Sequence, residues 1–104
     1  MVNIPEAVRS GIENYIERIR QEIPVDKAIL FGSYASGTFD DGSDIDLAIF
    51  SNYFQGMKRV DSIAFLLGHA MDYDLDLDPL AFTSDENSER LGMVDEILKT
   101  GIEI

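Results

Sequence analysis

Three segments of the chain repeat an apolar residue every three or four positions. This spacing is that of one face of an α-helix, and it predicts amphipathic helices over residues 5–22, 57–71 and 86–100. Pro5 suits the first position of the first helix, and Pro24 lies just after the place where its pattern stops. Prolines therefore set both ends of the first predicted helix.

Four shorter segments have the pattern of extended chain. The apolar run 27–31, which stops at Gly32, predicts a buried strand. Apolar and polar residues alternate over 43–50 and 73–82, and this alternation predicts strands with two different faces. Residues 102–104 predict a short edge strand. The order of elements predicts an α/β (α+β) fold, with one mixed β-sheet and helices packed on one face.

Length and composition indicate one globular domain over residues 1–104. Hydrophobic residues make up 45% of the chain and charged residues 27%, which is ordinary for a soluble protein. No apolar run approaches the roughly 20 residues that span a membrane, and Met1 does not begin a signal-peptide pattern. We therefore expect a cytoplasmic protein without a membrane association. The sequence has no cysteine and only one histidine, His69, which makes a zinc site improbable.

The charge balance restricts the kinds of partner. The chain has 20 acidic and 8 basic residues and a formal net charge of −12. Direct binding to nucleic acid normally needs a basic surface, so we do not expect it here. An acidic surface instead favours hard cations or a basic protein partner.

The first candidate for chemistry is the pair Gly32-Ser33, which directly follows the predicted buried strand. Glycine lets the backbone approach a ligand closely. If a helical turn starts at Ser33, its first N–H groups and the helix dipole favour a phosphate. The alternative is an ordinary strand-to-helix turn with Ser33 as the N-cap.

The second candidate is the pair Asp44 and Asp46. Residues two apart on a strand project from the same face, so these two carboxylates can converge on one or two divalent cations. Two such ions can hold the attacking and the leaving oxygen of an in-line phosphoryl displacement. The alternative is a solvent-facing strand edge, although aspartate is disfavoured in strands.

A third acidic group is formed by Asp74, Asp76 and Asp78. The three share one face of the predicted strand 73–82, and one of them could complete a three-carboxylate site. A calcium-binding EF-hand loop is excluded, because no glycine stands at its required sixth position.

Together these motifs resemble a known family. The segments Gly32-Ser33-Tyr34-Ala35-Ser36-Gly37 and Ser43-Asp44-Ile45-Asp46-Leu47 are similar to the signature of the DNA polymerase β-like nucleotidyltransferases, in which Gly-Ser precedes Asp-x-Asp. The resemblance covers nearly the whole chain and is closest to the minimal nucleotidyltransferase (MNT) branch. It implies the nucleotidyltransferase fold.

The resemblance also implies roles for individual residues. Gly32, Ser33 and Ser43 would bind the triphosphate of ATP, and Asp44 and Asp46 would ligate two Mg²⁺ ions. Asp78 fits the third catalytic carboxylate best, with Asp76 as its alternative and Asp74 third. An acceptor hydroxyl would attack the α-phosphate and expel pyrophosphate, while the third carboxylate helps to deprotonate the hydroxyl.

Ser36 departs from the family pattern. Many minimal members carry arginine at this position, and the guanidinium could brace a phosphate. Its absence removes a positive charge from an already acidic site and puts catalytic competence, though not the fold, in question.

The resemblance finally implies a partner. Minimal members of this kind act as antitoxins of HEPN/MNT toxin–antitoxin modules, in which they transfer AMP from ATP to a tyrosine of a HEPN-type RNase toxin (AMPylation). The acidic surface suits such a basic partner, and a hetero-oligomer or homo-oligomer is compatible with it. One alternative is an antitoxin that acts by binding without catalysis. Another is transfer to a small molecule or polynucleotide, with the acceptor site supplied by another subunit.

Overall fold

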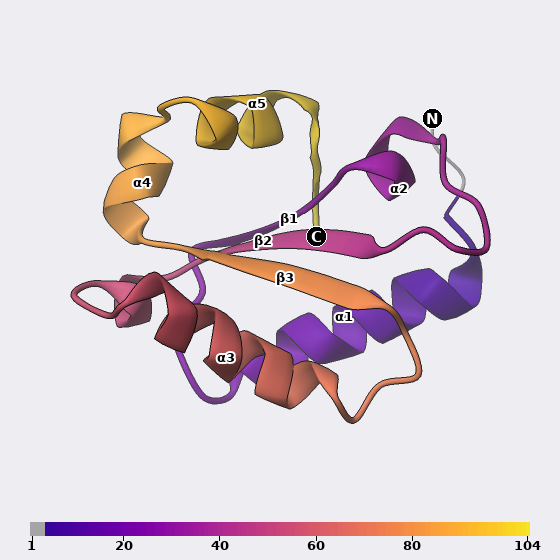
Figure 1. Ribbon diagram of the computed structural model, residues 1–104, viewed down its shortest axis with the longest axis horizontal. Coiled ribbons are helices and arrows are strands. Elements are labelled where there is room, and N and C mark those ends of the chain that lie inside the picture. Colours follow the sequence, from indigo (N-terminus) through magenta and orange to yellow (C-terminus); the bar gives the residue numbers. More distant parts are fainter. Residues whose placement is uncertain (1–3) are drawn as a thin grey trace.

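One four-stranded mixed sheet organises the protein. The computed structural model describes residues 4–104 and orders the strands β3-β2-β1-β4 (Figure 1). The strands are β1 (Lys27–Phe31), β2 (Ile45–Phe50), β3 (Leu77–Phe82) and β4 (Ile102–Glu103). β1 pairs antiparallel with β2 and β4, whereas β2 and β3 run parallel. The mixed α+β fold predicted from the sequence is therefore confirmed.

The helices are α1 (Glu6–Arg20), α2 (Ser33–Ser36), the 3₁₀ turn η1 (Asn52–Phe54), α3 (Arg59–Ala70), α4 (Ser84–Glu89) and α5 (Met93–Thr100). α1 and α3 lie side by side under one face of the sheet (Figure 1). Ile12, Tyr15, Ile16 and Ile19 form the buried stripe of α1. Among residues 4–104, no helix is long and apolar enough to cross a membrane.

α5 covers the opposite face of the sheet. Its Val94 and Ile97 are buried in a second cluster with Ile29, Ala48 and Phe50. The expectation that helices pack on one face holds for α1 and α3 but is wrong for α5. The reason lies in the face of β2 that points away from α1 and α3. This face carries Asp46 near its start and the apolar residues Ala48 and Phe50 further on, and only the apolar residues need to be buried.

The predicted strand 73–82 begins only at Leu77. Leu77 pairs with Ile45, the first residue of β2, so chain before Leu77 has no neighbouring strand to extend the ladder. Leu75 packs against α1 instead: a Cβ added at Gly11 would lie 2.4 Å from its Cδ1. Tyr73 donates a hydrogen bond of 2.6 Å to Asn14 on the same helix. Contacts with α1 thus replace the predicted first half of the strand.

The predicted helix 86–100 is two helices. Arg90 (φ 53°) and Gly92 (φ 55°) adopt left-handed backbone and separate α4 from α5. Leu91, an apolar residue of the predicted helix 86–100, is 70% exposed between them. The short edge strand predicted at 102–104 is present as β4.

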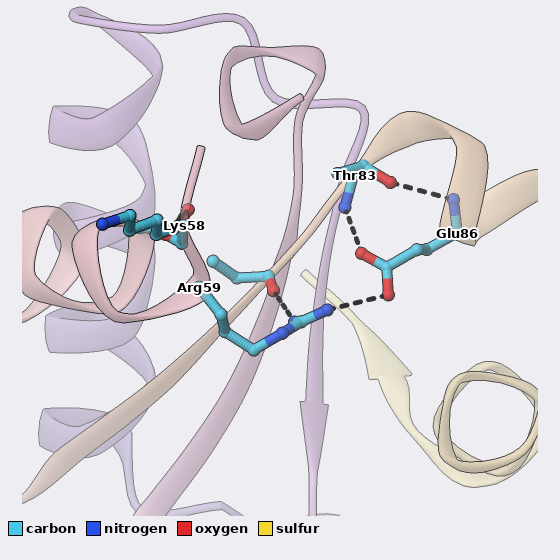
Figure 2. A network of polar contacts seen from close by, with 6 residues as sticks. Lys58, Arg59, Thr83 and Glu86 are labelled. Atoms are coloured by element: carbon cyan, nitrogen blue, oxygen red, sulfur yellow. Dashed lines mark hydrogen bonds and ion pairs between the residues drawn. The ribbon is translucent and has the colours of Figure 1, made fainter. Parts of the chain in front are cut away.

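A polar network closes the end of the sheet at the C-terminus of β3 (Figure 2). Arg59 donates to the carbonyl of Ala81 (2.6 Å) and to the Glu86 carboxylate (3.0 Å). Thr83 and Glu86 bond reciprocally as a capping box that starts α4. Burial alone would raise the Glu86 pKa. The hydrogen bonds from Thr83 and Arg59, together with the Arg59 charge, outweigh burial and hold this pKa below its ordinary value. The network fixes α3, β3 and α4 at the end of β3 away from Asp78.

Candidate active site

The turn between β1 and α2 brings backbone against a carboxylate. Gly32 has φ 73° and ψ −151°, a conformation that side chains rarely adopt. The residue before it, Phe31, pairs with Asp46 across the β1–β2 ladder. A Cβ added at Gly32 would lie 2.1 Å from Oδ2 of Asp46. Both the backbone angle and the space beside Asp46 therefore require glycine here.

α2 is a single turn that directly follows Gly32. The N–H groups of Ala35 and Ser36 donate to the Gly32 carbonyl at 3.1 Å, which leaves those of Ser33 and Tyr34 at the start of the turn. Such groups suit a phosphate. Tyr34 is buried and stacks on Phe39 at 4.4 Å between ring centroids. The residue pattern did not predict this aromatic pair, which anchors the turn; its one signal is the placement of an aromatic residue on each side of Gly37.

Asp46 and Asp78 lie next to each other on two neighbouring strands. They are register partners on the parallel strands β2 and β3, and alternation along each strand puts their side chains on the face that α5 partly covers. Burial raises the pKa of the Asp46 carboxyl to about 6, reinforced by a hydrogen bond with Asp78 and by the charges of Asp78 and Asp44. The Asp46 carboxyl is therefore protonated more readily than an ordinary aspartate.

Asp44 lies at the edge of this pair. The predicted strand 43–50 begins at Ile45, so Asp44 precedes β2, and it is exposed. Its charge is still close enough to raise the Asp46 pKa. The structure therefore brings Asp44, Asp46 and Asp78 together at one end of the sheet, beside Gly32.

The other two candidate acids lie elsewhere. Asp76 precedes β3; its carbonyl accepts from Ile45 N–H at 2.8 Å, and the residue lines a hollow beside α3. Asp74 is exposed in the turn between α3 and β3. Of the three acids, Asp78 alone contacts Asp46, and its catalytic role stays a prediction.

The segment before Asp44 contains a turn at Asp40-Asp41-Gly42. Gly42 N–H donates to the Asp40 carboxylate at 2.9 Å, and Asp40 N–H donates to the Ser43 hydroxyl at 2.9 Å. Ser43 thus stabilises the turn that delivers Asp44. Its predicted contact with nucleotide stays a prediction, since the hydroxyl is engaged with Asp40.

The donor set fits a hard divalent cation in type. Carboxylate oxygens are the ligands that Mg²⁺ prefers, and a cation would neutralise the like charges that now raise the Asp46 pKa. Within residues 4–104, however, no three acidic, histidine or cysteine side chains are already arranged to hold a metal. Binding of a cation would therefore require these side chains to rearrange.

Four of the eight basic side chains form ion pairs away from this site. Arg18 pairs with Asp72, Arg59 with Glu86, and both Arg90 and Lys99 with Asp95. At the position where related proteins often carry arginine, Ser36 donates to the Ser33 carbonyl (3.3 Å) and bonds the Thr38 hydroxyl (2.8 Å).

This geometry has the form of a nucleotidyltransferase, and comparison with known proteins agrees. Residues 12–102 match the family described as nucleotidyltransferase domain, and the chain belongs to this family. The match spans α2, Asp44, Asp46 and Asp78, the strands β1 to β3 and the first residue of β4. The nucleotidyltransferase fold and class are thus established for the chain.

Two individual proteins illustrate the similarity. A protein of Methanocaldococcus jannaschii, provisionally named a protein adenylyltransferase, is 28% identical over 81 residues, which are 77% of this chain and 79% of the relative. A crystal structure of a provisionally named nucleotidyltransferase from Sulfolobus solfataricus superposes with a TM-score of 0.67 at 20% identity. That comparison covers 99% of this chain and 89% of the other, and it supports the fold.

Proposed function

We propose that this nucleotidyltransferase transfers AMP from ATP to a hydroxyl group of a partner protein, with Mg²⁺ bound by Asp44, Asp46 and Asp78. The observation that carries the proposal is the contact between Asp46 and Asp78 beside the Gly32 turn. It joins a phosphate-binding backbone to a group of carboxylates. The provisional name of the M. jannaschii relative supports a protein as the acceptor.

Each residue then has a defined task. The first N–H groups of α2, at Ser33 and Tyr34, bind phosphate oxygens of ATP, and Gly32 keeps the backbone close to Asp46. Asp44, Asp46 and Asp78 bind Mg²⁺, which when present neutralises charge on the phosphates. The buried Tyr34–Phe39 stack keeps the turn in place. The backbone is therefore organised before nucleotide arrives, which lowers the cost of binding.

The transfer step forms one bond and breaks one. The acceptor oxygen attacks the α-phosphorus, the bond from that phosphorus to the oxygen bridging the β-phosphate breaks, and pyrophosphate leaves. Asp78 accepts the hydroxyl proton, because it is the exposed member of the Asp46–Asp78 pair and can face an incoming acceptor. The products are an AMP-modified acceptor and pyrophosphate.

We further propose that the acceptor is a tyrosine of a HEPN-type RNase toxin, so that the protein acts as an antitoxin. The net charge of −12 favours a basic, RNA-binding partner. A second candidate is an antitoxin that acts by binding alone. Two observations favour it: Ser36 replaces the usual arginine, and no metal-binding group of three side chains is preformed within residues 4–104.

One experiment separates the candidates. The protein is incubated with ATP labelled at the α-phosphate and Mg²⁺, with and without the protein encoded beside it. Transfer of label to that protein, lost in the Asp44→Asn/Asp46→Asn variant, supports catalysis. Co-purification of the two proteins without transfer of label supports the binding candidate. Absence of both transfer and binding overturns the antitoxin proposal.

A further inference from the structure

The outer face of α3 carries apolar side chains that no other part of residues 4–104 covers. Val60, Leu67 and Met71 are 69%, 43% and 84% exposed, and Ala64 and Gly68 between them are also exposed. These five positions recur at helical spacing and form one row, here called the α3 stripe. Single exposed apolar residues are ordinary, but a continuous row marks an interaction surface.

A hollow of about 560 Å³ lies beside the C-terminal half of the α3 stripe. Its walls come from α3 and from Tyr73, Leu75, Asp76 and Leu77 on the segment that leads into β3. Gly68 lies in this wall, and a Cβ added there would meet nothing within 4 Å. Glycine weakens a helix relative to alanine, and no contact in the described chain requires it here. Its missing side chain leaves room for a second helix to approach closely.

Acidic residues surround the stripe and the hollow. Asp61, Asp72, Asp74 and Asp76 are all exposed. Asp72 pairs with Arg18 at 2.8 Å, whereas Asp74 and Asp76 make no ion pair among residues 4–104. The basic residues Lys58 and Arg59 stand at the far end of α3, and Arg59 is engaged with Glu86. The half of the stripe next to the hollow is thus apolar with an acidic rim.

This charge pattern selects the occupant. A second copy of the chain would bring the same acids and another net charge of −12 against the rim. A partner with basic residues at matching positions would pair with Asp74 and Asp76 while its apolar residues cover Leu67 and Met71. The length and helical form of the stripe suit an amphipathic helix lying along it.

We propose that the α3 stripe and the adjacent hollow bind an amphipathic helix of another protein, apolar on one face and carrying lysine or arginine along both edges. Leu77 in the wall of the hollow directly precedes Asp78. A helix bound here therefore lies at the same edge of the sheet as the carboxylates. The inference deepens the proposed function, because it gives the surface that holds the acceptor protein, yet the binding itself needs no nucleotide.

The test uses synthetic peptides without ATP or metal. One peptide forms an amphipathic helix with leucines on one face and lysines along both edges. A second replaces the lysines with glutamates, and a third scrambles the first so that no apolar face remains. Binding is followed by calorimetry, and backbone amide NMR shifts locate it. Leu67→Asp places a charge in the stripe, and Leu91→Asp is the matched control at an exposed leucine outside it.

We expect the lysine peptide to bind with shifts confined to α3 and residues 71–77. Leu67→Asp should weaken this binding by at least tenfold, Asp74→Asn/Asp76→Asn by several-fold, and Leu91→Asp not at all. Equal binding of the glutamate or scrambled peptide would overturn the proposal, as would no binding of the lysine peptide at millimolar concentration. A dimer in sedimentation that Leu67→Asp dissociates would also overturn it, because a second copy would then be the occupant. Failure of AMP transfer with normal peptide binding would count against the proposed function alone.

Discussion

Asp46 and Asp78 occupy the same register position on two neighbouring parallel strands, and Asp78 lies close enough to help raise the pKa of the Asp46 carboxyl. Aspartate is disfavoured in strands, and two ionised carboxylates at this separation repel each other. The two negative charges therefore repel each other, and a proton or a divalent cation would reduce this repulsion. Both residues lie at the part of the sheet that α5 does not cover, where solvent can reach them.

Asp46→Asn should stabilise the metal-free protein at pH 8. The Asp46 pKa in the folded protein is raised to about 6 from an ordinary 3.8, so ionisation favours the unfolded chain. This carboxyl therefore supports the fold most strongly below its ordinary pKa, and that support is lost as pH rises to about 6. Because the side chain is partly exposed, we expect a gain of about 1 kcal/mol for the variant at pH 8.

Urea unfolding in the presence of EDTA measures this effect. Wild type and Asp46→Asn should differ at pH 8 and converge near pH 4, where the wild-type carboxyl is protonated. Asp61→Asn, on the exposed surface of α3, serves as the control for loss of one negative charge. Equal unfolding free energies of wild type and Asp46→Asn at pH 8 would refute the repulsion argument.

Asp78→Asn should lower AMP transfer by about 100-fold, because in the proposed mechanism Asp78 takes the proton of the acceptor hydroxyl beside Asp46. Asp76→Asn should leave the rate at saturating partner nearly unchanged, since Asp76 lies beside α3 and would affect only the binding of the partner. Pyrophosphate release with the partner present measures both rates. A larger loss in Asp76→Asn than in Asp78→Asn would reverse the assignment of the third carboxylate.

The parts of the site that are close in sequence could be predicted, and those that depend on packing could not. Gly32 is recognisable because it directly follows an apolar run, and Asp44 and Asp46 because they stand two residues apart on a predicted strand. Both patterns involve only neighbouring residues. The choice of Asp78 over Asp76 depends on the register between β2 and β3, which residue pattern leaves open. Likewise, the alternation 73–82 predicts a strand, but Leu75 packs on Gly11 of α1, and the strand starts later.

The second helical layer shows the same limit. Val94 and Ile97 have an ordinary amphipathic spacing, which predicts a helix but does not say which face of the sheet it covers. That choice depends on Ala48 and Phe50 lying on the same face as Asp46. Because α5 covers only the apolar half of this face, the carboxylates of Asp46 and Asp78 stay accessible.

Ser36→Arg should raise the affinity for Mg·ATP by about tenfold, since a guanidinium beside the phosphates adds a charge-assisted hydrogen bond. Ser36 is exposed, and its hydroxyl bonds only within its own turn, to Ser33 and Thr38. The substitution is therefore expected to leave the fold intact. Ser36→Gln is the matched control, with a long side chain but no charge. Calorimetric titration with a non-hydrolysable ATP analogue measures the effect, and equal affinities of the two variants would contradict it.

Gly32→Ala should abolish nucleotide binding, because the new Cβ would lie 2.1 Å from Oδ2 of Asp46 and displace that carboxylate. Gly56→Ala separates this clash from backbone strain. Gly56 has a similar left-handed backbone, φ 80°, but a Cβ there meets nothing within 4 Å. Both variants should lose about 1 kcal/mol of unfolding free energy from strain, with a further loss for Gly32→Ala alone. Titration with Mg·ATP should then show normal binding by Gly56→Ala and none by Gly32→Ala. Full binding by Gly32→Ala would mean that the close approach to Asp46 is not needed for the nucleotide site.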